Sequence, residues 1–229
     1  MNNTLVSFLC KSENSYTNNL SLFLQQYGYD SSIIVDDKNR YNIPDEATYC
    51  GLTKVCEDRP SSWEYSIYNI SSHKLYHIYD YFFFIEDDVF SKQNNTFVNL
   101  ISIWNKHNYD FIAKKIRPKY QEEDWIWWKD TNNWNNFDNP YKSFNTICRV
   151  SSRLIKKIIS YQKIYQKFNF HEILFISLCI ENNYSFMDYE DNQDLKKYID
   201  INRIIPELSD IQIIHDDKLY HPYKKLLNE

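Results

Sequence analysis

The sequence predicts an α/β fold, in which a central and mostly parallel β-sheet is flanked by helices in three layers. The chain opens as strand, helix and strand, and it then continues to alternate apolar runs of strand length with helical patterns. One apolar run, residues 81–85, ends in three consecutive acids. Such alternation is typical of a parallel sheet. At 229 residues the chain is expected to form one domain, 1–229.

The composition excludes several classes of protein. A hydrophobic content of 43% and an aromatic content of 17% argue against disorder. The net charge of -5 argues against a nucleic-acid-binding protein, which is normally basic. The two glycines, Gly28 and Gly51, lie far apart, whereas a P-loop and a dinucleotide fingerprint both need clustered glycines. A bound phosphate is therefore expected to be held by a metal and by side chains.

The chain is expected to be a soluble, cytoplasmic protein. No apolar run approaches the roughly 20 residues that span a membrane. The N-terminus has no basic segment, and its apolar stretch is too short for a secretory signal. The five cysteines are Cys10, Cys50, Cys56, Cys148 and Cys179. Their odd number and scattered positions favour free thiols in a reducing compartment.

The opening of the chain predicts the start of a parallel sheet. Residues 4–10 form an apolar run typical of a buried strand, and residues 17–27 have apolar positions at helical spacing. Residues 32–35 predict a second strand, which ends in Asp36 and Asp37. Acids at this position either bind a ribose or base edge or form a simple turn.

The remaining elements follow from the same patterns. A helix that begins near residue 61, with Trp63 among its apolar positions, is expected to lead into the strand at 81–85. The other expected elements are a short helix at 45–57, a helix at 94–107, a strand at 109–113, a strand at 144–150, a helix from 151 to about 166, a helix that opens at 168–175 and reaches about 181, and strands at 184–189 and 210–214.

The central strand carries the strongest chemical signal. Its apolar run, 81–85, predicts a strand buried on both faces, and Glu86, Asp87 and Asp88 follow at its C-terminal end. Crowded carboxylates repel one another, and a nearby cation relieves that repulsion. Hard oxygen ligands suit Mg²⁺ or Mn²⁺, which can hold a phosphate as a leaving group. The alternative is a solvated acidic turn after a core strand.

Two later positions could take part in the same chemistry. Glu172 lies at a predicted helix start, where a carboxylate is favoured by the helix dipole or could serve as a general base. His221 and Lys224 follow the last predicted strand, with Pro222 between them. They could bind a metal and a phosphate, or His221 could be structural.

The segment 114–140 is polar but rich in tryptophan. Its four tryptophans are Trp125, Trp127, Trp128 and Trp134. Tryptophan faces stack on sugar rings and are favoured at binding surfaces. The alternative is that these side chains anchor an irregular loop to the core.

Taken together, these residues resemble the GT-A glycosyltransferases, and in particular small soluble members with a Phe-Ile-Glu-Asp-Asp-Val strand end and a late His-Pro-x-Lys. In that family an Asp-x-Asp-type motif holds Mn²⁺ or Mg²⁺, which bridges the diphosphate of a nucleotide sugar. The resemblance assigns Glu86, Asp88 and His221 to the metal. It places Asp87 within the motif, as a cofactor-binding residue, and Lys224 on the diphosphate.

The resemblance also implies the remaining roles. Asp36 or Asp37 would contact the nucleoside, and Glu172 would be the base of an inverting reaction; if it is not, a retaining mechanism is favoured. Residues 1–113 would form the nucleotide-binding half and 114–229 the acceptor-binding half.

The implied reaction moves a sugar from a nucleotide-sugar donor to a hydroxyl of a glycan or another acceptor. A UDP-sugar or a GDP-sugar is the expected donor. Two alternatives remain open. One is a metal-dependent nuclease or phosphohydrolase, which would need a basic surface if it acts on nucleic acid. The other is a non-catalytic carbohydrate-binding protein in which the acids are structural.

Overall fold

The computed structural model describes residues 3–35, 62–125, 128, 137–165, 170–200 and 217–221. The predicted helix at 45–57 and the predicted strand at 210–214 lie outside these residues. The strands are β1 (Thr4–Cys10), β2 (Asp30–Val35), β3 (Tyr81–Glu86), β4 (Phe111–Pro118), β5 (Tyr141–Ser151), β6 (Phe186–Asp188), β7 (Ile199–Asp200) and β8 (Leu219–Tyr220). The α-helices are α1 (Ser15–Gln26), α2 (Ser62–Ser72), α3 (Asn95–Trp104), α5 (Ser152–Tyr165), α6 (His171–Glu181) and α7 (Gln193–Lys196).

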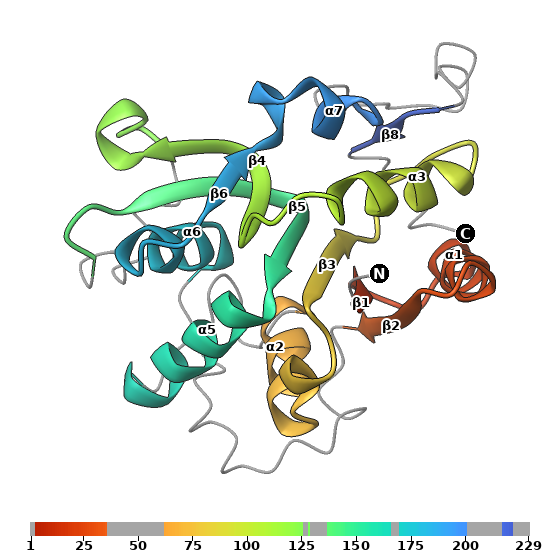
Figure 1. Ribbon diagram of the computed structural model, residues 1–229, viewed down its shortest axis with the longest axis horizontal. Helices are drawn as coiled ribbons and strands as arrows, with labels where there is room; N and C mark the ends of the chain where they lie inside the picture. Colours follow the sequence, from red (N-terminus) through yellow and green to blue (C-terminus); the bar gives the residue numbers. More distant parts are fainter. Residues whose placement is uncertain are drawn as a thin grey trace.

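Six of these strands form one central sheet, in the order β2-β1-β3-β5-β4-β6 (Figure 1). β1 pairs in parallel with both β2 and β3, and β4 pairs in parallel with β6. β5 is antiparallel to both of its neighbours, β3 and β4. Within this sheet five strands therefore point the same way and β5 is reversed, which confirms the mostly parallel α/β architecture.

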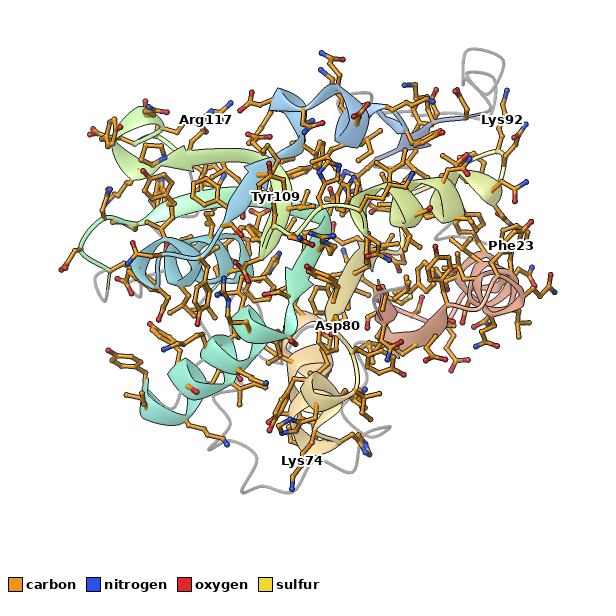
Figure 2. All side chains as sticks on the ribbon, viewed as in Figure 1. Phe23, Lys74, Asp80, Lys92, Tyr109 and Arg117 are labelled. Atoms are coloured by element: carbon orange, nitrogen blue, oxygen red, sulfur yellow. The ribbon has the colours of Figure 1, made fainter. Side chains whose placement is uncertain are left out.

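Helices cover both faces of the central sheet (Figure 1). α2, α5 and α6 pack on the face to which Phe82 and Phe84 point, and α1, α3 and α7 cover the face of Phe83 and Ile85. None of these four side chains is exposed. A strand covered on both sides requires an unbroken apolar run, which is the pattern of β3. Figure 2 shows the side chains that fill the space between the sheet and the two helical layers.

The bounds of α1 follow from local chemistry. Asn14 precedes the helix, and its side-chain oxygen accepts the backbone N–H of Thr17 at 2.8 Å. Such a cap satisfies one of the free N–H groups of the first turn, so the helix begins two residues before the predicted start. Gly28 follows the helix with a φ of 80°, a left-handed conformation that favours glycine.

One charged side chain is fully buried in the sheet. The guanidinium of Arg149, on β5, donates hydrogen bonds to the backbone carbonyls of Trp104, His107 and Tyr109. It also lies 4.0 Å from the ring centroid of Tyr81. Because the last carbonyls of a helix lack partners within the helix, Arg149 stabilises the end of α3 and ties it to the sheet.

Two further expectations concern thiols and membranes. Cys10, Cys148 and Cys179 are buried and form no disulfide among the described residues, while Cys50 and Cys56 lie outside those residues. In the part of the chain that the structure describes, every helix is too short or too polar to cross a bilayer.

Candidate metal site

The acidic triplet lies at the C-terminal edge of the parallel strands. Glu86 is the last residue of β3, and in the turn that follows the Val89 N–H donates to the Glu86 carbonyl at 3.1 Å. β1 and β2 end at the same edge because they run parallel to β3. In open α/β sheets this edge is where ligands bind.

The structure brings Glu86, Asp88 and His221 together. Each offers one ligand atom, and these three atoms lie within 4.8 Å of one another. Nε2 of His221 lies 3.0 Å from Oδ1 of Asp88 and 3.5 Å from Oε2 of Glu86. The three residues that the sequence analysis assigned to a metal therefore form one cluster, in which all three side chains are partly buried.

A short strand pairing brings His221 to the acids. Tyr220, the last residue of β8, forms a bridge with Phe90, which follows the acidic turn. The Phe90 N–H donates to the Tyr220 carbonyl at 3.0 Å, and the Tyr220 N–H donates back at 2.8 Å. His221 is the next residue, so this pairing sets the imidazole beside the carboxylates.

The cluster has the electrostatic character of a cation site. Burial lowers the pKa of His221, but the carboxylates of Asp88 and Glu86 outweigh burial and raise this pKa to about 9. Among the described residues, Nδ1 of His221 is a buried atom without a hydrogen-bond partner, while Nε2 of the same ring faces the two carboxylates. Two carboxylates and an imidazole suit Mn²⁺ or Mg²⁺, and these residues fit such an ion.

An aromatic residue that the sequence analysis placed only on the apolar face of a helix also contacts the cluster. The indole N–H of Trp63, on α2, donates to Oε1 of Glu86 at 3.2 Å. The indole stacks on the imidazole of His171, with ring centroids 3.9 Å apart. A signal was present in the sequence, since a buried indole N–H needs an acceptor, but the identity of the acceptor depends on the fold.

Asp87 lies within the triplet, but its side chain makes a different contact. Its Oδ2 accepts the backbone N–H of Lys11 at 3.0 Å. The register of β1 and β3 pairs Leu9 with Glu86, which places the Lys11 amide beside Asp87. Burial raises the pKa of Asp87 to about 6. In the structure this carboxylate joins the end of β1 to the acidic turn, and its cofactor-binding role stays a prediction.

Glu172 lies in the first turn of α6 and is almost fully buried. Its Oε1 accepts the backbone N–H of Asn145 at 3.3 Å. Burial, followed by the charge of Glu86, raises the pKa of Glu172 to about 8. Burial, followed by the charges of Glu86 and Glu172, also raises the pKa of the Cys148 thiol on β5. The predicted role of Glu172 as a base is not tested by these contacts.

The two described tryptophans of the segment 114–140 differ in their surroundings. Trp128 is buried and donates from its indole to the Glu122 carbonyl at 2.9 Å, so it anchors this segment. Trp125 is partly buried and meets Trp128 edge to face at 5.1 Å. The ammonium of Lys142 lies 4.6 Å from the centroid of the Trp125 ring.

Several predicted positions lie outside the described residues. They are Asp36, Asp37, Trp127, Trp134 and Lys224. The nucleoside-binding and diphosphate-binding roles assigned to Asp36, Asp37 and Lys224 therefore stay predictions.

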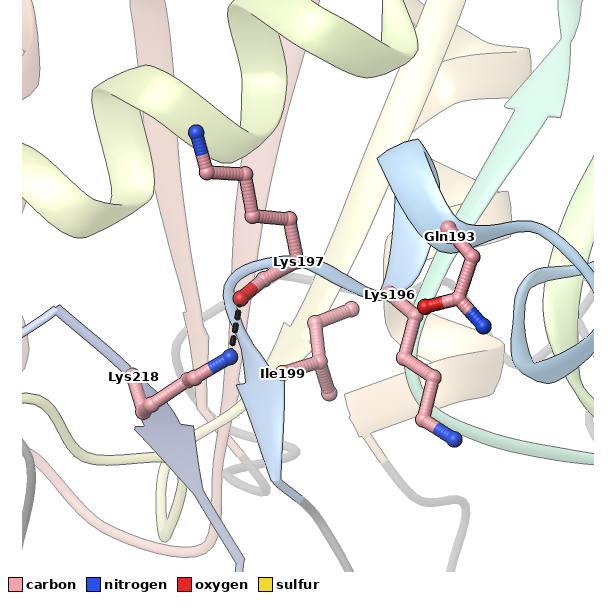
Figure 3. A pocket seen from close by; sticks show the side chains of 5 residues that line it. All are labelled: Gln193, Lys196, Lys197, Ile199 and Lys218. Carbon is pink, nitrogen blue, oxygen red and sulfur yellow. Dashed lines mark hydrogen bonds between the residues drawn. The ribbon is translucent and has the colours of Figure 1, made fainter.

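A cationic cavity lies beside α7 and the first residue of β7. It has a volume of about 280 Å³ and is lined by Gln193, Lys196, Lys197, Ile199 and Lys218. Figure 3 shows the Lys218 ammonium donating to the Lys197 carbonyl. β8 separates Lys218 from His221, and none of the lining residues belongs to the acidic cluster.

No family model matches the chain, and no curated protein matches it. Among solved structures, the chain is similar to the "crystal structure of a glycosyltransferase involved in the glycosylation of the major capsid of PBCV-1", with 12% identity and a TM-score of 0.33. The match covers 69% of this chain and 66%, just under two thirds, of that chain. Nothing about activity follows from a likeness at this level.

Proposed function

We propose that this protein is a metal-dependent glycosyltransferase that moves a sugar from a nucleotide-sugar donor to a hydroxyl of a glycan or another acceptor. The observation that carries this proposal is the cluster of Glu86, Asp88 and His221 at the C-terminal edge of a mostly parallel sheet. That edge is the usual ligand-binding edge of such sheets. A cation site there suits a substrate that contains phosphate.

The chemistry requires the departure of a nucleoside diphosphate. A divalent cation bound by the two carboxylates and by Nε2 of His221 would supply a Lewis acid that stabilises the negative charge of the leaving group. Lys224, three residues after His221, would contact the same diphosphate. Asp36 and Asp37, which directly follow β2, would contact the nucleoside.

The acceptor hydroxyl needs a base because it is far too weak an acid to ionise unaided. We assign this role to Glu172. Burial, followed by the charge of Glu86, raises the pKa of Glu172, and a cation bound at Glu86 would remove the second of these two contributions. Glu172 then accepts the hydroxyl proton while the sugar is attacked from the face opposite the leaving group, which gives an inverting reaction.

A thermal denaturation screen tests the donor class. UDP-sugars and GDP-sugars are added with Mn²⁺, and the screen is repeated with EDTA. A ligand at about 100 times its Kd stabilises by about 2.7 kcal/mol. With an unfolding entropy of about 2.1 cal/mol/K per residue over 229 residues, this corresponds to a rise in Tm of roughly 5 to 6 °C. We expect a metal-dependent rise with one nucleotide family.

A negative screen has a clear meaning. The absence of any rise would contradict the proposed donor. Cleavage of a phosphodiester in Mg²⁺ would then support a nuclease or phosphohydrolase, and binding of free glycans without turnover would support a carbohydrate-binding protein.

A substitution tests the cluster itself. Asp88→Asn removes one carboxylate, and we expect transfer to fall by a factor of about 100 to 1,000, since losing one such interaction typically costs about 2.7 to 4 kcal/mol of barrier. Asp30→Asn is the matched control, because Asp30 is an exposed acid at the start of β2, on the opposite edge of the sheet. Undiminished turnover by Asp88→Asn would rule out the metal role, whereas Asp30→Asn should retain full activity.

A further inference from the structure

The two oxygens of the Glu86 carboxylate have different partners. Oε2 faces His221 at 3.5 Å, within the cluster. Oε1 accepts the indole N–H of Trp63 at 3.2 Å. A hydrogen bond to one oxygen restricts the rotation of the carboxylate, and it leaves the other oxygen facing His221 within the cluster.

The indole that makes this bond is itself held on several sides. Its ring stacks on the His171 imidazole, with an interplanar angle of 10°. Phe84 of β3 lies at 5.4 Å in a tilted contact, and Phe175 of α6 meets the indole edge to face at 5.8 Å. Only 4% of Trp63 is exposed. The indole therefore has little freedom to rotate, and its N–H keeps one direction.

The stacking partner connects this arrangement to the proposed base. His171 is the first residue of α6, and Glu172 follows it. The first turn of α6 thus carries both the imidazole that stacks on Trp63 and the carboxyl group of Glu172, which we propose as the base for the acceptor hydroxyl.

We propose that Trp63, held by the stacked His171, is a positioning residue that orients Glu86 toward a divalent cation. This inference rests on the proposed function, because it requires the cluster to bind a metal. Outer partners of metal ligands typically change metal affinity by about 10- to 100-fold when they are removed.

A purely structural role makes a different prediction. If Glu86 only accepts a hydrogen bond from a core indole, loss of the N–H changes the packing, and any effect on metal affinity does not depend on Glu86. If Trp63 orients Glu86, the loss acts through the carboxylate and disappears when the carboxylate is absent. Metal affinity in single and double variants therefore separates the two roles.

The first measurement is the Kd for Mn²⁺ by isothermal titration calorimetry, on the full chain. Trp63→Phe keeps an aromatic ring and removes the N–H donor. A second variant replaces Trp63 by its benzothiophene analogue, in which sulfur takes the place of the N–H and the bicyclic shape is kept, so that folding is preserved. We expect both to weaken Mn²⁺ binding at least tenfold.

Trp104→Phe is the matched control. Trp104 is fully buried, and like Trp63 it donates from its indole N–H at 3.2 Å, here to the Leu195 carbonyl on the other face of the sheet. This variant loses an equivalent hydrogen bond away from the cluster. Its Kd for Mn²⁺ should stay within about twofold of the wild-type value.

The second measurement places Trp63→Phe in a Glu86→Ala background. We expect no further loss of Mn²⁺ affinity there. An equal loss with and without Glu86, or a Kd for the benzothiophene variant within twofold of wild type, overturns the positioning role while metal binding by the wild type still supports the proposed function. Absence of Mn²⁺ binding by the wild-type protein overturns the proposed function and this inference with it.

Discussion

Replacing His171 by phenylalanine should remove a pH-dependent loss of stability. Burial lowers the pKa of His171 to about 3, because its imidazole lies between Trp63 and the core of α6. The folded protein therefore keeps the ring neutral where the unfolded chain binds a proton. Phenylalanine preserves a stacked ring of similar size and has no proton to bind.

The sign and size of the effect follow from linkage. Below an unfolded pKa of about 6.5 the unfolded chain takes up a proton that the folded protein does not, so stability is present above this pH and is lost as the pH falls toward 3. Between pH 7 and pH 4.5 the loss is about two pH units at about 1.36 kcal/mol each, or roughly 3 kcal/mol. This is an upper value, because 9% of His171 stays exposed.

The assay is urea denaturation of both proteins at pH 7 and at pH 4.5. Glu172 and Asp87, whose pKa values burial raises, contribute in the opposite direction, and they do so in both proteins. The difference between the proteins therefore isolates His171. We expect His171→Phe to lose about 3 kcal/mol less than the wild type on acidification. The reasoning would be refuted if both proteins lost the same free energy of unfolding on acidification and if the His171 imidazole titrated above pH 5 by NMR.

Two other substitutions test the core and the proposed base. Arg149→Lys cannot reproduce a fork that donates to three carbonyls, so at least one carbonyl loses its donor and we expect a loss of about 1 to 3 kcal/mol in urea denaturation. Arg153→Lys, which changes an exposed partner of Asp110, should cost under about 1 kcal/mol. Equal costs would contradict the anchoring role of Arg149. Glu172→Gln should lower kcat by about 100- to 10,000-fold and keep the Kd for Mn²⁺, and an unchanged kcat would exclude Glu172 as the base.

The sequence was sufficient to predict most of the described elements. The opening strand, helix and strand, the central strand and the helices after residues 61, 94, 151 and 168 are all present, because each depends on local hydrophobic spacing. The observed boundaries differ from the predicted ones where a side chain caps a helix, as Asn14 does for α1. They also differ where strand pairing extends a strand, as in β4 and β5.

The direction of β5 was beyond the sequence pattern. The residues of β5 indicate an extended and buried segment, and such a pattern is the same for either direction of the strand. β5 pairs antiparallel with both β3 and β4, and its direction depends on how the chain connects these strands in the sheet.

By itself the sequence determined that an apolar strand ends in an acidic turn, because adjacent residues share one stretch of backbone. Only the tertiary structure decided what surrounds those acids. The pairing of β8 with Phe90 brings in His221, the register of β1 turns Asp87 toward Lys11, and the packing of α2 places Trp63 on Glu86. Each contact joins segments that are distant in the chain, so its geometry depends on how sheet and helices pack and not on local spacing.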